Sequence, residues 1–216
     1  MDVFFLRVSD YEACPDRFFA PLISGETRCA GLACGNPRVR LTKWLGEAMV
    51  RCLLRSIWGL KPSDYCILRG AHGKPYVSAA IPVFFNLSHS GDYVVCAVGG
   101  EEVGIDIERR GRVRMEVARR YFHPDEVALL EHTPPEQRTA LFFDHWSVKE
   151  SYLKYTGEGL ADTLSACKVS FDGTVTIERG HSLQPVAVRE CPIDKTYSCF
   201  ICTARPEAFG INHFQF

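Results

Sequence analysis

The sequence predicts an α+β fold of two similar halves, residues 1–100 and 101–216, with the active site in the cleft between them. In each half, a stretch of apolar residues at helical spacing is followed by short strand-like runs separated by Gly, Pro and Ser. Helices and antiparallel strands in this order are typical of α+β proteins. We therefore expect a duplicated architecture in which helices pack on a small antiparallel sheet in each half, although the two halves share no visible sequence similarity.

The composition is that of a globular protein. Of the 216 residues, 46% are apolar and 12% are aromatic, and 25 basic residues nearly balance 26 acidic ones. A chain of this length buries a sizeable core without disulfides, and its aromatic content excludes disorder. The pI of about 6.6 argues against a general nucleic-acid binder. Apolar runs stay short of about 18 residues and Val3–Leu6 is followed by no cleavage pattern, so we expect a soluble cytoplasmic protein outside the membrane.

The first half is predicted to contain one strand, a long helix and four further strands. Residues 3–8 form the first strand, and the Pro-, Gly- and Cys-rich stretch 21–37 is expected to be irregular. Apolar residues at helical spacing from Leu41 to Ile57 predict the helix, and Gly59 is expected to end it. The other strands are expected to form an antiparallel meander over residues 65–68, 75–77, 83–87 and 93–98.

The second half begins near Val103 and is predicted to repeat this plan. Thr133-Pro-Pro-Glu136 has the form of a capping box and predicts a helix that runs to Tyr155, with Gly157 as its C-cap. Two apolar stripes on this helix indicate that most of it is buried between layers. The hairpin signal Asp172-Gly173 lies among the expected strands, which are residues 168–171, 174–178, 186–188 and 197–203.

The ten cysteines are expected to be reduced and mostly buried. Cys199 and Cys202 form the one C-x-x-C pair, but they lie in a predicted strand and would point to opposite sides of it. The sequence offers no second pair to complete four zinc ligands, so we expect no structural zinc site.

The segment Val103–Glu108 is predicted to be a strand that carries two acids on one face. Gly104, Asp106 and Glu108 share that face, because side chains alternate along a strand. Neighbouring carboxylates are favourable when a hard cation such as Mg²⁺ lies between them. We expect Gly104 to leave room for a ligand. The alternative interpretation is a solvated edge strand with alternating polar residues.

Glu150 and Lys154 lie four residues apart on the predicted buried helix, between its two apolar stripes. On an exposed helix they would form an ordinary surface ion pair. Charges on a largely buried helix are instead paired or functional.

Two predicted turns carry groups suited to an anion. Ser88 and His89 place a hydroxyl and an imidazole at a loop tip, and Lys74 and Pro75 present one ammonium from a stiffened turn. Each of these turns, taken alone, is equally compatible with an ordinary hydrogen-bonded surface loop.

These four segments occur in one order: G-K-P-Y at 73–76, N-L-S-H-S at 86–90, G-I-D-I-E at 104–108 and W-S-V-K-E-S-Y-L-K at 146–154. Together, over residues 41–160, they resemble the 4′-phosphopantetheinyl transferases, in particular the large monomeric class that activates surfactin synthetase. The resemblance implies a pseudo-dimer of two α+β halves in a monomer. It also implies transfer of 4′-phosphopantetheine from coenzyme A to a serine of an acyl or peptidyl carrier protein, with Mg²⁺, releasing 3′,5′-ADP.

The resemblance also implies roles for individual residues. Asp106, Glu108 and Glu150 would bind Mg²⁺, and the catalytic residues would be Glu150, Lys154 and Asp106. Lys154 would contact the phosphate under attack. Coenzyme A would be bound by Lys74, Pro75, Ser88, His89, Arg40 and Lys43. Its 3′-phosphate would be held by basic residues of the first half, for which the candidates are Arg28, Arg38, Arg40 and Lys43.

Glu150 is implied as the general base toward the incoming serine, with a water held by the cation as the alternative, because a cation-bound carboxylate is a weak base. The loop after this helix reads Gly157-Glu158-Gly159-Leu160, where family members often carry a Lys in place of the Glu. A positive charge near the site is therefore expected to be missing.

Six arginines follow the acidic strand, in the runs 109–114 and 119–120. Carrier proteins are typically acidic around their serine, so the surface near residues 109–122 is a candidate docking site. A solvated charge run is the alternative. Two other functions fit the same residues, namely a Mg²⁺-dependent hydrolase of a nucleotide pyrophosphate and a non-catalytic binding module for coenzyme A or carrier protein.

Overall fold

The long helix and the strands of each half form where the pattern predicts them. The computed structural model describes residues 1–159, 162–206 and 208–216, and side chains 162 and 163 are left out of the description. In the first half, α3 (Pro37–Trp58) ends at Gly59, which has a φ of 67°. In the second half, α6 (Pro135–Thr156) ends at Gly157, with a φ of 73°. Both helices have 22 residues and the same left-handed glycine C-cap.

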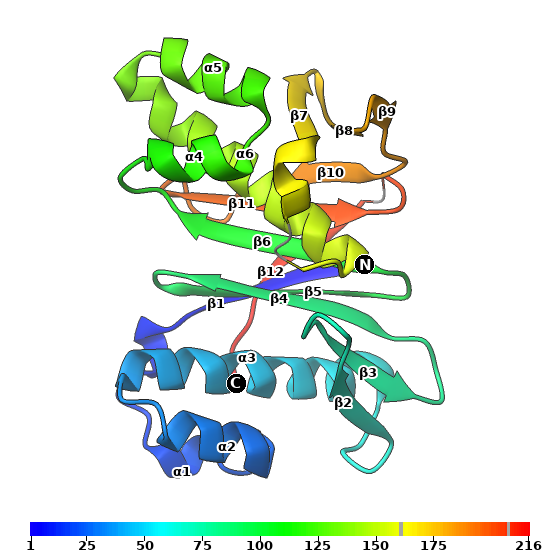
Figure 1. Ribbon diagram of the computed structural model, residues 1–216. Coiled ribbons are helices and arrows are strands. Elements are labelled where there is room, and N and C mark those ends of the chain that lie inside the picture. Colours follow the sequence, from blue (N-terminus) through cyan, green and yellow to red (C-terminus); the bar gives the residue numbers. More distant parts are fainter. Residues whose placement is uncertain (160–161, 207) are drawn as a thin grey trace.

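The strands form two main sheets that lie face to face (Figure 1). The first sheet has the order β12-β1-β5-β4, with β1 (Asp2–Arg7), β4 (Phe84–Ser90), β5 (Tyr93–Gly99) and β12 (Gly210–His213). The second has the order β6-β11-β10-β8-β7, and β9 (Ser182–Leu183) pairs with β8. Its strands are β6 (Val103–Arg109), β7 (Cys167–Asp172), β8 (Thr174–Arg179), β10 (Ala187–Glu190) and β11 (Tyr197–Thr203).

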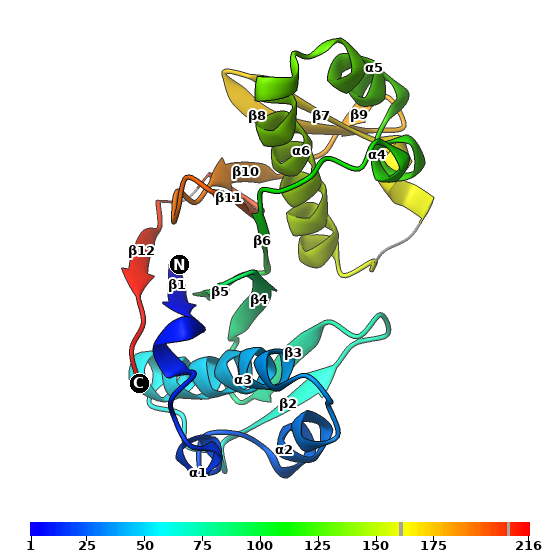
Figure 2. The same cartoon turned by 90° about the vertical axis from the view of Figure 1, so that its left-hand side faces the viewer.

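Helices cover the outer faces of both sheets, which gives the order α3, first sheet, second sheet, α6 (Figures 1 and 2). One apolar cluster packs α3 on the first sheet, through Leu45, Met49 and Leu53 among others. A second lies between the sheets and includes Val95 and Ile105. A third packs α6 on the second sheet, and a fourth lies among α4 (Met115–Tyr121), α5 (Pro124–His132) and α6. The predicted α+β class with helix-covered sheets is confirmed.

The stretch 21–37, expected to be irregular, contains α2 (Gly25–Leu32), so that prediction was wrong. The oxygen of Ser24 caps this helix by accepting a hydrogen bond from the Thr27 amide. Gly31 packs directly against the indole of Trp44 on α3. The glycine that suggested a loop instead allows close contact between two helices. A short helix, α1 (Asp16–Phe19), and a 3-10 turn, η1 (Ser9–Tyr11), precede α2.

The predicted meander of the first half is also divided differently. β2 (Tyr65–Arg69) and β3 (Pro75–Ala79) pair with each other in a separate two-stranded sheet. β4 and β5 pair antiparallel within the first sheet, as expected. The first sheet is completed by β12, which pairs parallel to β1 and comes from the end of the chain. The division at residue 100 stays a prediction about domains, and β12 crosses it.

The start of α6 differs from the prediction as well. Its N-cap is Pro134, and the predicted capping box at Thr133 is absent, because the Thr133 hydroxyl donates to the carbonyl of Leu129 instead. A capping box does form at the start of α5, where His123 and Glu126 cap each other's backbone amides. The hairpin at Asp172 and Gly173 joins β7 and β8 as predicted. After α6, the chain reaches β7 through the turn η2 (Asp162–Ala166).

Cys199 and Cys202 point to opposite sides of β11, as the strand prediction required. Cys199 belongs to the apolar cluster between the sheets, and Cys202 to the cluster under α6. Both thiols are buried and free, and burial raises their pKa values above the ordinary value. In the described part of the chain, helices long and apolar enough to cross a membrane are absent.

Candidate active site

The centre of the site is a three-way contact between Asp106 on β6, Lys154 on α6 and Ser88 on β4. The Nζ of Lys154 donates to Asp106 Oδ1 over 2.6 Å and to Ser88 Oγ over 2.9 Å. Ser88 Oγ in turn donates to Asp106 Oδ1 over 2.9 Å. Asp106 is 3% exposed, so its charge is balanced within the protein by the Lys154 ammonium. The structure thus joins three of the predicted site residues from three separate elements. Ser88 and His89 were predicted at the tip of a loop, and that prediction was wrong, because both residues lie in the strand β4.

The face of β6 that carries the two acids is the predicted one. Ile105 and Ile107 point into the cluster between the sheets, and Asp106 and Glu108 point to the other side. Gly104 does not provide room for a ligand, so that expectation was wrong. A Cβ placed on Gly104 would lie 2.0 Å from the Ser151 carbonyl oxygen and 2.3 Å from the Tyr155 nitrogen. The glycine lets α6 pack directly on β6.

Glu150 on α6 lies in the field of the two acids of β6. Burial raises its pKa to about 7, the negative charge of Asp106 contributes in the same direction, and Lys154 opposes both. Burial, followed by the charge of Asp106, also raises the pKa of Glu108. The Glu108 carboxylate accepts a hydrogen bond of 2.7 Å from Ser90 Oγ. Three carboxyl groups are therefore close enough to influence each other's ionisation.

Two oxygens of this group are buried and lack hydrogen-bond partners among the described residues. They are Asp106 Oδ2 and Glu150 Oε1. Buried carboxylate oxygens are nearly always paired, and hard cations are bound by oxygen ligands of this kind. The donor chemistry of Asp106, Glu108 and Glu150 therefore fits Mg²⁺. Within the described ranges, however, three such side chains do not converge on one point, and Lys154 occupies one side of Asp106. The three-carboxylate metal site stays a prediction.

Four of the six predicted coenzyme A residues line one pocket of about 360 Å³. The pocket is lined by Lys43 of α3, Pro75 of β3, and Ser88 and His89 of β4, together with Thr27, Arg69 and others. Desolvation, followed by the charge of Lys154, lowers the pKa of His89, which favours the neutral imidazole near pH 7. A smaller pocket of about 240 Å³ adjoins it through Pro75 and Leu87 and is lined by Lys74, Glu150 and Lys154.

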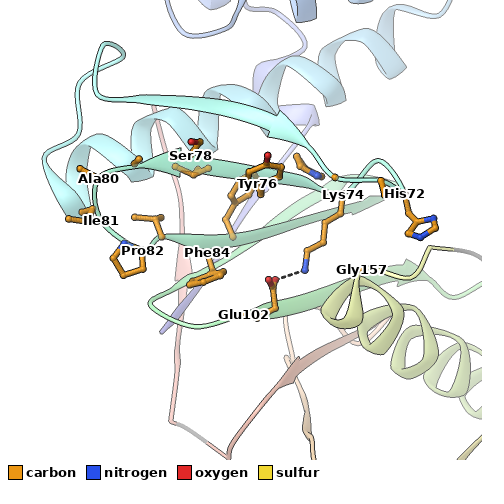
Figure 3. A pocket seen from close by; sticks show the side chains of 17 residues that line it. His72, Lys74, Tyr76, Ser78, Ala80, Ile81, Pro82, Phe84, Glu102 and Gly157 are labelled. Atoms are coloured by element: carbon orange, nitrogen blue, oxygen red, sulfur yellow. Dashed lines mark hydrogen bonds and ion pairs between the residues drawn. The ribbon is translucent and has the colours of Figure 1, made fainter.

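Lys74 connects the first half to the second rather than standing free. Its Nζ forms an ion pair of 2.5 Å with Glu102 and donates to the carbonyl oxygens of Val103 and Tyr155. Figure 3 shows this ion pair beside a larger pocket of about 570 Å³ between the hairpin β2–β3 and the loop that precedes β6. The side chains of Tyr76, Phe84 and Pro82 line its apolar part.

Arg40, predicted to contact coenzyme A, lies apart from the pocket that contains Ser88 and His89. Its guanidinium is 3.7 Å from Asp16 and lies over the Trp44 ring at 5.4 Å, in a separate pocket near the start of α3. Arg28 is exposed on α2. Of the four candidates for the 3′-phosphate, Lys43 is the one that lines the pocket with His89.

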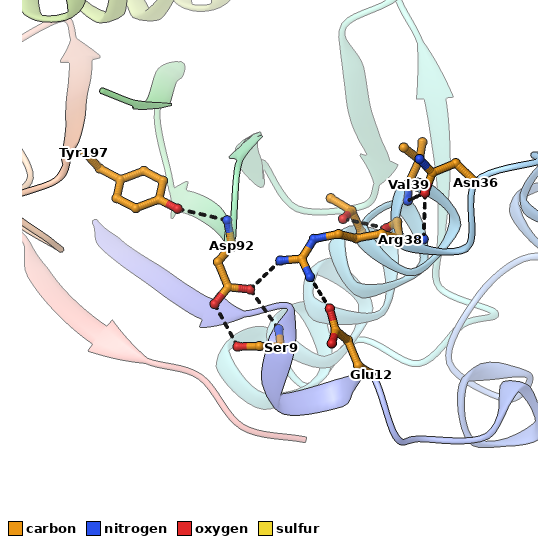
Figure 4. Close-up of polar contacts among 8 residues, drawn as sticks. Ser9, Glu12, Asn36, Arg38, Val39, Asp92 and Tyr197 are labelled. Carbon is orange, nitrogen blue, oxygen red and sulfur yellow. Dashed lines mark hydrogen bonds and ion pairs between the residues drawn. The ribbon is translucent and has the colours of Figure 1, made fainter. Parts of the chain in front are cut away.

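Arg38 is bound by two carboxylates instead, Glu12 and Asp92 (Figure 4). Asp92 follows the Ser88–Ser90 segment, and it also accepts hydrogen bonds from the amide and hydroxyl of Ser9. Its own amide donates to the Tyr197 hydroxyl of β11 over 2.9 Å. Asp92 therefore anchors the turn after β4 to the N-terminal segment, to α3 and to the second sheet.

Sequence reasoning missed Arg69, the last residue of β2, which lines the pocket with Lys43 and His89. Arg69 pairs with Pro75 across the β2–β3 hairpin, so correct pairing of the two strands would have brought it beside the G-K-P turn. Glu158 stands where a positive charge was expected to be missing. Its carboxylate forms an ion pair with Arg179 on β8.

The basic run after β6 borders a groove of about 730 Å³. Arg109, Arg112 and Arg114 line it with aromatic side chains of α4 and α6, and two acids, Glu108 and Glu116, line it as well. Arg110 is turned away, since it pairs with Asp144 and donates to the Lys195 carbonyl. Arg119 pairs with Glu131 on the surface. Only part of the run is therefore free to meet a partner.

Comparison with known proteins returned one family and several relatives. A model of the 4′-phosphopantetheinyl transferase superfamily matches residues 102–202. A 4′-phosphopantetheinyl transferase of Bacillus subtilis is 35% identical over 165 residues, covering 76% of this chain and 74% of the relative. The transferase psf-1 of Bacillus pumilus is 36% identical, covering 76% and 71%. Among solved structures, the holo-[acyl-carrier-protein] synthase of Thermotoga maritima matches with a TM-score of 0.39 and 17% identity, covering 47% of this chain and 61% of the other.

Proposed function

The chain belongs to the 4′-phosphopantetheinyl transferase family, and we propose that it transfers 4′-phosphopantetheine from coenzyme A to a serine of an acyl or peptidyl carrier protein, with Mg²⁺. The observation that carries the proposal is the contact of Lys154 with Asp106. Lys154 and Glu150 line a pocket that adjoins the one lined by Lys43 and His89. Phosphoryl transfer is catalysed mainly by positioning the reactants and by neutralising charge. Here Lys154 supplies a positive charge, Glu150 a candidate base and Asp106 a fixed carboxylate.

The reaction forms a bond between the serine oxygen and the phosphorus that carries the pantetheine. The bond between this phosphorus and the bridging oxygen of the pyrophosphate breaks, and 3′,5′-ADP leaves with the electron pair. The proton of the serine hydroxyl must pass to a base. Atoms and charge balance without an oxidant or reductant.

Glu150 is the residue proposed to accept that proton. A general base works best when its pKa lies near the operating pH, and the pKa of Glu150 is about 7 in the protein without a cation. A cation held by the same carboxylate would lower this value, so a water held by Mg²⁺ is the alternative base. Burial and the neighbouring charge of Asp106 raise the pKa of Glu150 in the cation-free protein. An ordinary exposed glutamate is a weaker base, because its pKa of about 4.3 is more than about two units lower.

Lys154 is proposed to stabilise the charge that develops on the pyrophosphate. Its ammonium is fixed by Asp106 and Ser88, so it needs little reorganisation as the reaction proceeds. Asp106, Glu108 and Glu150 would hold Mg²⁺, which when bound neutralises pyrophosphate charge.

The two adjoining pockets suggest how coenzyme A is bound. The adenosine and its 3′-phosphate would occupy the pocket of Lys43, Arg69 and His89, and the pyrophosphate would lie toward Lys154. The carrier protein would dock over the groove lined by Arg109, Arg112 and Arg114, which Glu108 also lines. Its acidic surface would meet these arginines and its serine would approach the acids from that side.

The test is the intact mass of several apo carrier proteins after incubation with the protein, coenzyme A and Mg²⁺. We expect a mass gain of one phosphopantetheine group. Glu150→Gln should lose nearly all turnover while coenzyme A binding weakens only modestly. Glu136→Gln is the matched control, since Glu136 lies exposed at the start of the same helix and should retain full activity.

Other outcomes favour other functions. Cleavage of coenzyme A without a mass gain on any carrier would contradict the transferase and favour a pyrophosphate hydrolase. Binding of coenzyme A without cleavage would favour a binding module.

A further inference from the structure

The edges of the two sheets meet at β4 and β6, and side chains join them. β4 is the last strand of the first sheet and β6 is the first strand of the second. Three backbone amides of β6, at alternate residues, donate hydrogen bonds to side chains of β4. Ile105 N donates to Asn86 Oδ1 (2.8 Å), Ile107 N to Ser88 Oγ (3.3 Å) and Arg109 N to Ser90 Oγ (3.0 Å). Every second residue of β4 thus serves every second amide of β6.

Ser88 and Ser90, which accept two of these three hydrogen bonds, also contact the two acids of β6. Ser88 Oγ donates to Asp106 Oδ1 over 2.9 Å, and Ser90 Oγ donates to Glu108 Oε2 over 2.7 Å. Each serine therefore accepts from the amide of one residue and donates to the carboxylate of the residue before it. A backbone amide can only donate, so the hydroxyl proton of each serine is directed to the carboxylate.

The hydrogen-bonding capacity of Ser88 is fully used in this arrangement. A hydroxyl has one donor and two acceptor positions. Ser88 donates to Asp106 and accepts from the Ile107 amide and from Lys154 Nζ. Its hydroxyl is therefore committed to the acid and the lysine, and contact with a ligand phosphate would break one of these bonds.

We propose that Ser88 and Ser90 are positioning residues that fix the carboxylates of Asp106 and Glu108 for cation binding. The proposal rests on the proposed function of the site. It assigns the hydroxyls of the S-H-S segment to β6, although Ser88 and His89 both line the pocket that contains Lys43. Because the amide contact fixes each serine along β6, a carboxylate held by it cannot turn to another rotamer without losing a charge-assisted hydrogen bond.

Ser90 gives the cleaner test, because Ser88 also contacts Lys154. In Ser90→Ala, Glu108 loses its hydroxyl donor while Asp106, Glu150 and Lys154 keep their contacts. Loss of a group that orients a metal ligand typically weakens metal affinity by about 10-fold to 100-fold. We expect this loss in the affinity for Mn²⁺, measured by electron paramagnetic resonance on the protein with coenzyme A and no carrier. The Mg²⁺ concentration for half-maximal transfer should rise by a similar factor, with the KM for the carrier unchanged.

Two variants serve as comparisons. Ser90→Thr keeps the hydroxyl and should restore Mn²⁺ affinity to within a few-fold of the unmodified protein. Ser56→Ala removes an exposed serine hydroxyl on α3 that donates only to the carbonyl of Leu53 in its own helix, and it should leave Mn²⁺ binding unchanged. If Ser90→Ala fails to fold, Mn²⁺ affinity is measured on Ser90→Cys instead. The thiol keeps about the size of the side chain but is a weak hydrogen-bond donor, so the same loss of affinity is expected.

The outcomes separate this inference from the proposed function. Unchanged Mn²⁺ affinity in Ser90→Ala or Ser90→Cys would overturn the inference, whatever the activity. Absence of Mn²⁺ binding in the unmodified protein would overturn it as well. A protein whose Mn²⁺ affinity depends on Ser90 but that modifies no carrier would keep the inference about the carboxylates and refute the transferase reaction.

Discussion

Single residues at the site perform tasks that their types alone do not reveal. Gly104 is an example, because the backbone of α6 fills the space beside its Cα where other residues have a side chain. Asp106 and Glu150 are acids of similar strength in water, yet Asp106 is paired with Lys154 and Glu150 has a buried oxygen without a partner among the described residues. The roles of the two carboxylates therefore follow from their neighbours.

Gly104→Ala should destabilise the protein strongly. Its Cβ would lie 2.0 Å from the Ser151 carbonyl oxygen, so α6 must move away from β6. We expect a loss of at least about 3 kcal/mol in the free energy of unfolding, at the upper end of the cost of overpacking, measured by urea denaturation. Gly100→Ala is the control, because a Cβ there meets open space and should change stability by less than about 1 kcal/mol. Equal stability of the two variants would contradict the contact.

The raised pKa of Glu150 predicts how stability depends on pH when metal and substrate are absent. The folded protein holds a proton on Glu150 up to about pH 7, whereas the unfolded chain releases it near pH 4.3. The resulting stabilisation is fully present below the unfolded value and is lost as pH rises through about 7. Denaturation between pH 5 and 8 should show a steeper fall for the unmodified protein than for Glu150→Gln. Parallel curves for the two proteins would show that the pKa is normal.

At the scale of elements, α6 is the part that brings the site together. It supplies Glu150 and Lys154 to the site, and other side chains of the helix pack on the second sheet and on α4 and α5. Its rotation is fixed on the opposite side by Lys149, whose ammonium is buried and paired with Glu126 of α5 over 2.9 Å. The ammonium also donates to the carbonyls of Leu164 and Cys167, and burial lowers its pKa. One buried ion pair thus connects α5, α6 and β7.

Removal of one partner of this pair should be costly. Glu126→Gln leaves the Lys149 ammonium buried without its counter-charge, and we expect a loss of about 3–5 kcal/mol in the free energy of unfolding. Asp125→Asn, one residue earlier in α5, breaks the exposed ion pair with Lys168 and should cost less than about 1 kcal/mol. Thermal or urea unfolding of the two variants compares them directly. A similar loss in both would mean that burial of the pair does not matter.

The elements were predicted well where a periodic pattern is long, and poorly where a single contact decides. The ends of α3 and α6 at Gly59 and Gly157 follow from the apolar pattern and the glycine that closes it. Helix α2 was missed although its cap, Ser24, lies directly before it in the sequence. The packing of Trp44 on Gly31, by contrast, is a contact that only the folded chain brings together. The acidic face of β6 followed from alternation, whereas the helix that fills the space at Gly104 did not.

In the whole molecule, the site lies where the two halves meet, and contacts between the halves hold it. Lys74 reaches Glu102 from the first half, the β4 side chains reach β6, and Asp92 reaches Tyr197. The order of the motifs along the chain predicted that they belong to one site. It did not predict that Arg40 would lie in a different pocket from His89, because that position depends on the contacts of Arg40 with Asp16 and the Trp44 ring, which form only in the folded chain.

The end of the chain should be necessary for the stability of the first half. β12 pairs with β1, and Phe214 and Phe216 pack on the α3 cluster, with Phe216 in ring contact with Tyr11. Removal of residues 210–216 exposes this apolar surface and should lower the free energy of unfolding by more than about 2 kcal/mol, measured by urea denaturation. Gln215→Ala, at an exposed position of the same segment, is the control and should have no measurable effect. Full stability of the shortened chain would contradict the role of β12.

The parallel pairing of β1 with β12 also sets an order of events during synthesis. β1 leaves the ribosome about 200 residues before its partner, so one edge of the first sheet stays open until β12 has been synthesised. The nascent first half can bring α3 onto β1, β5 and β4, but it carries an exposed strand edge for most of that time. An exposed edge invites pairing with other chains. Slow translation and crowding of nascent chains should therefore lower the yield of this protein more than its final stability suggests.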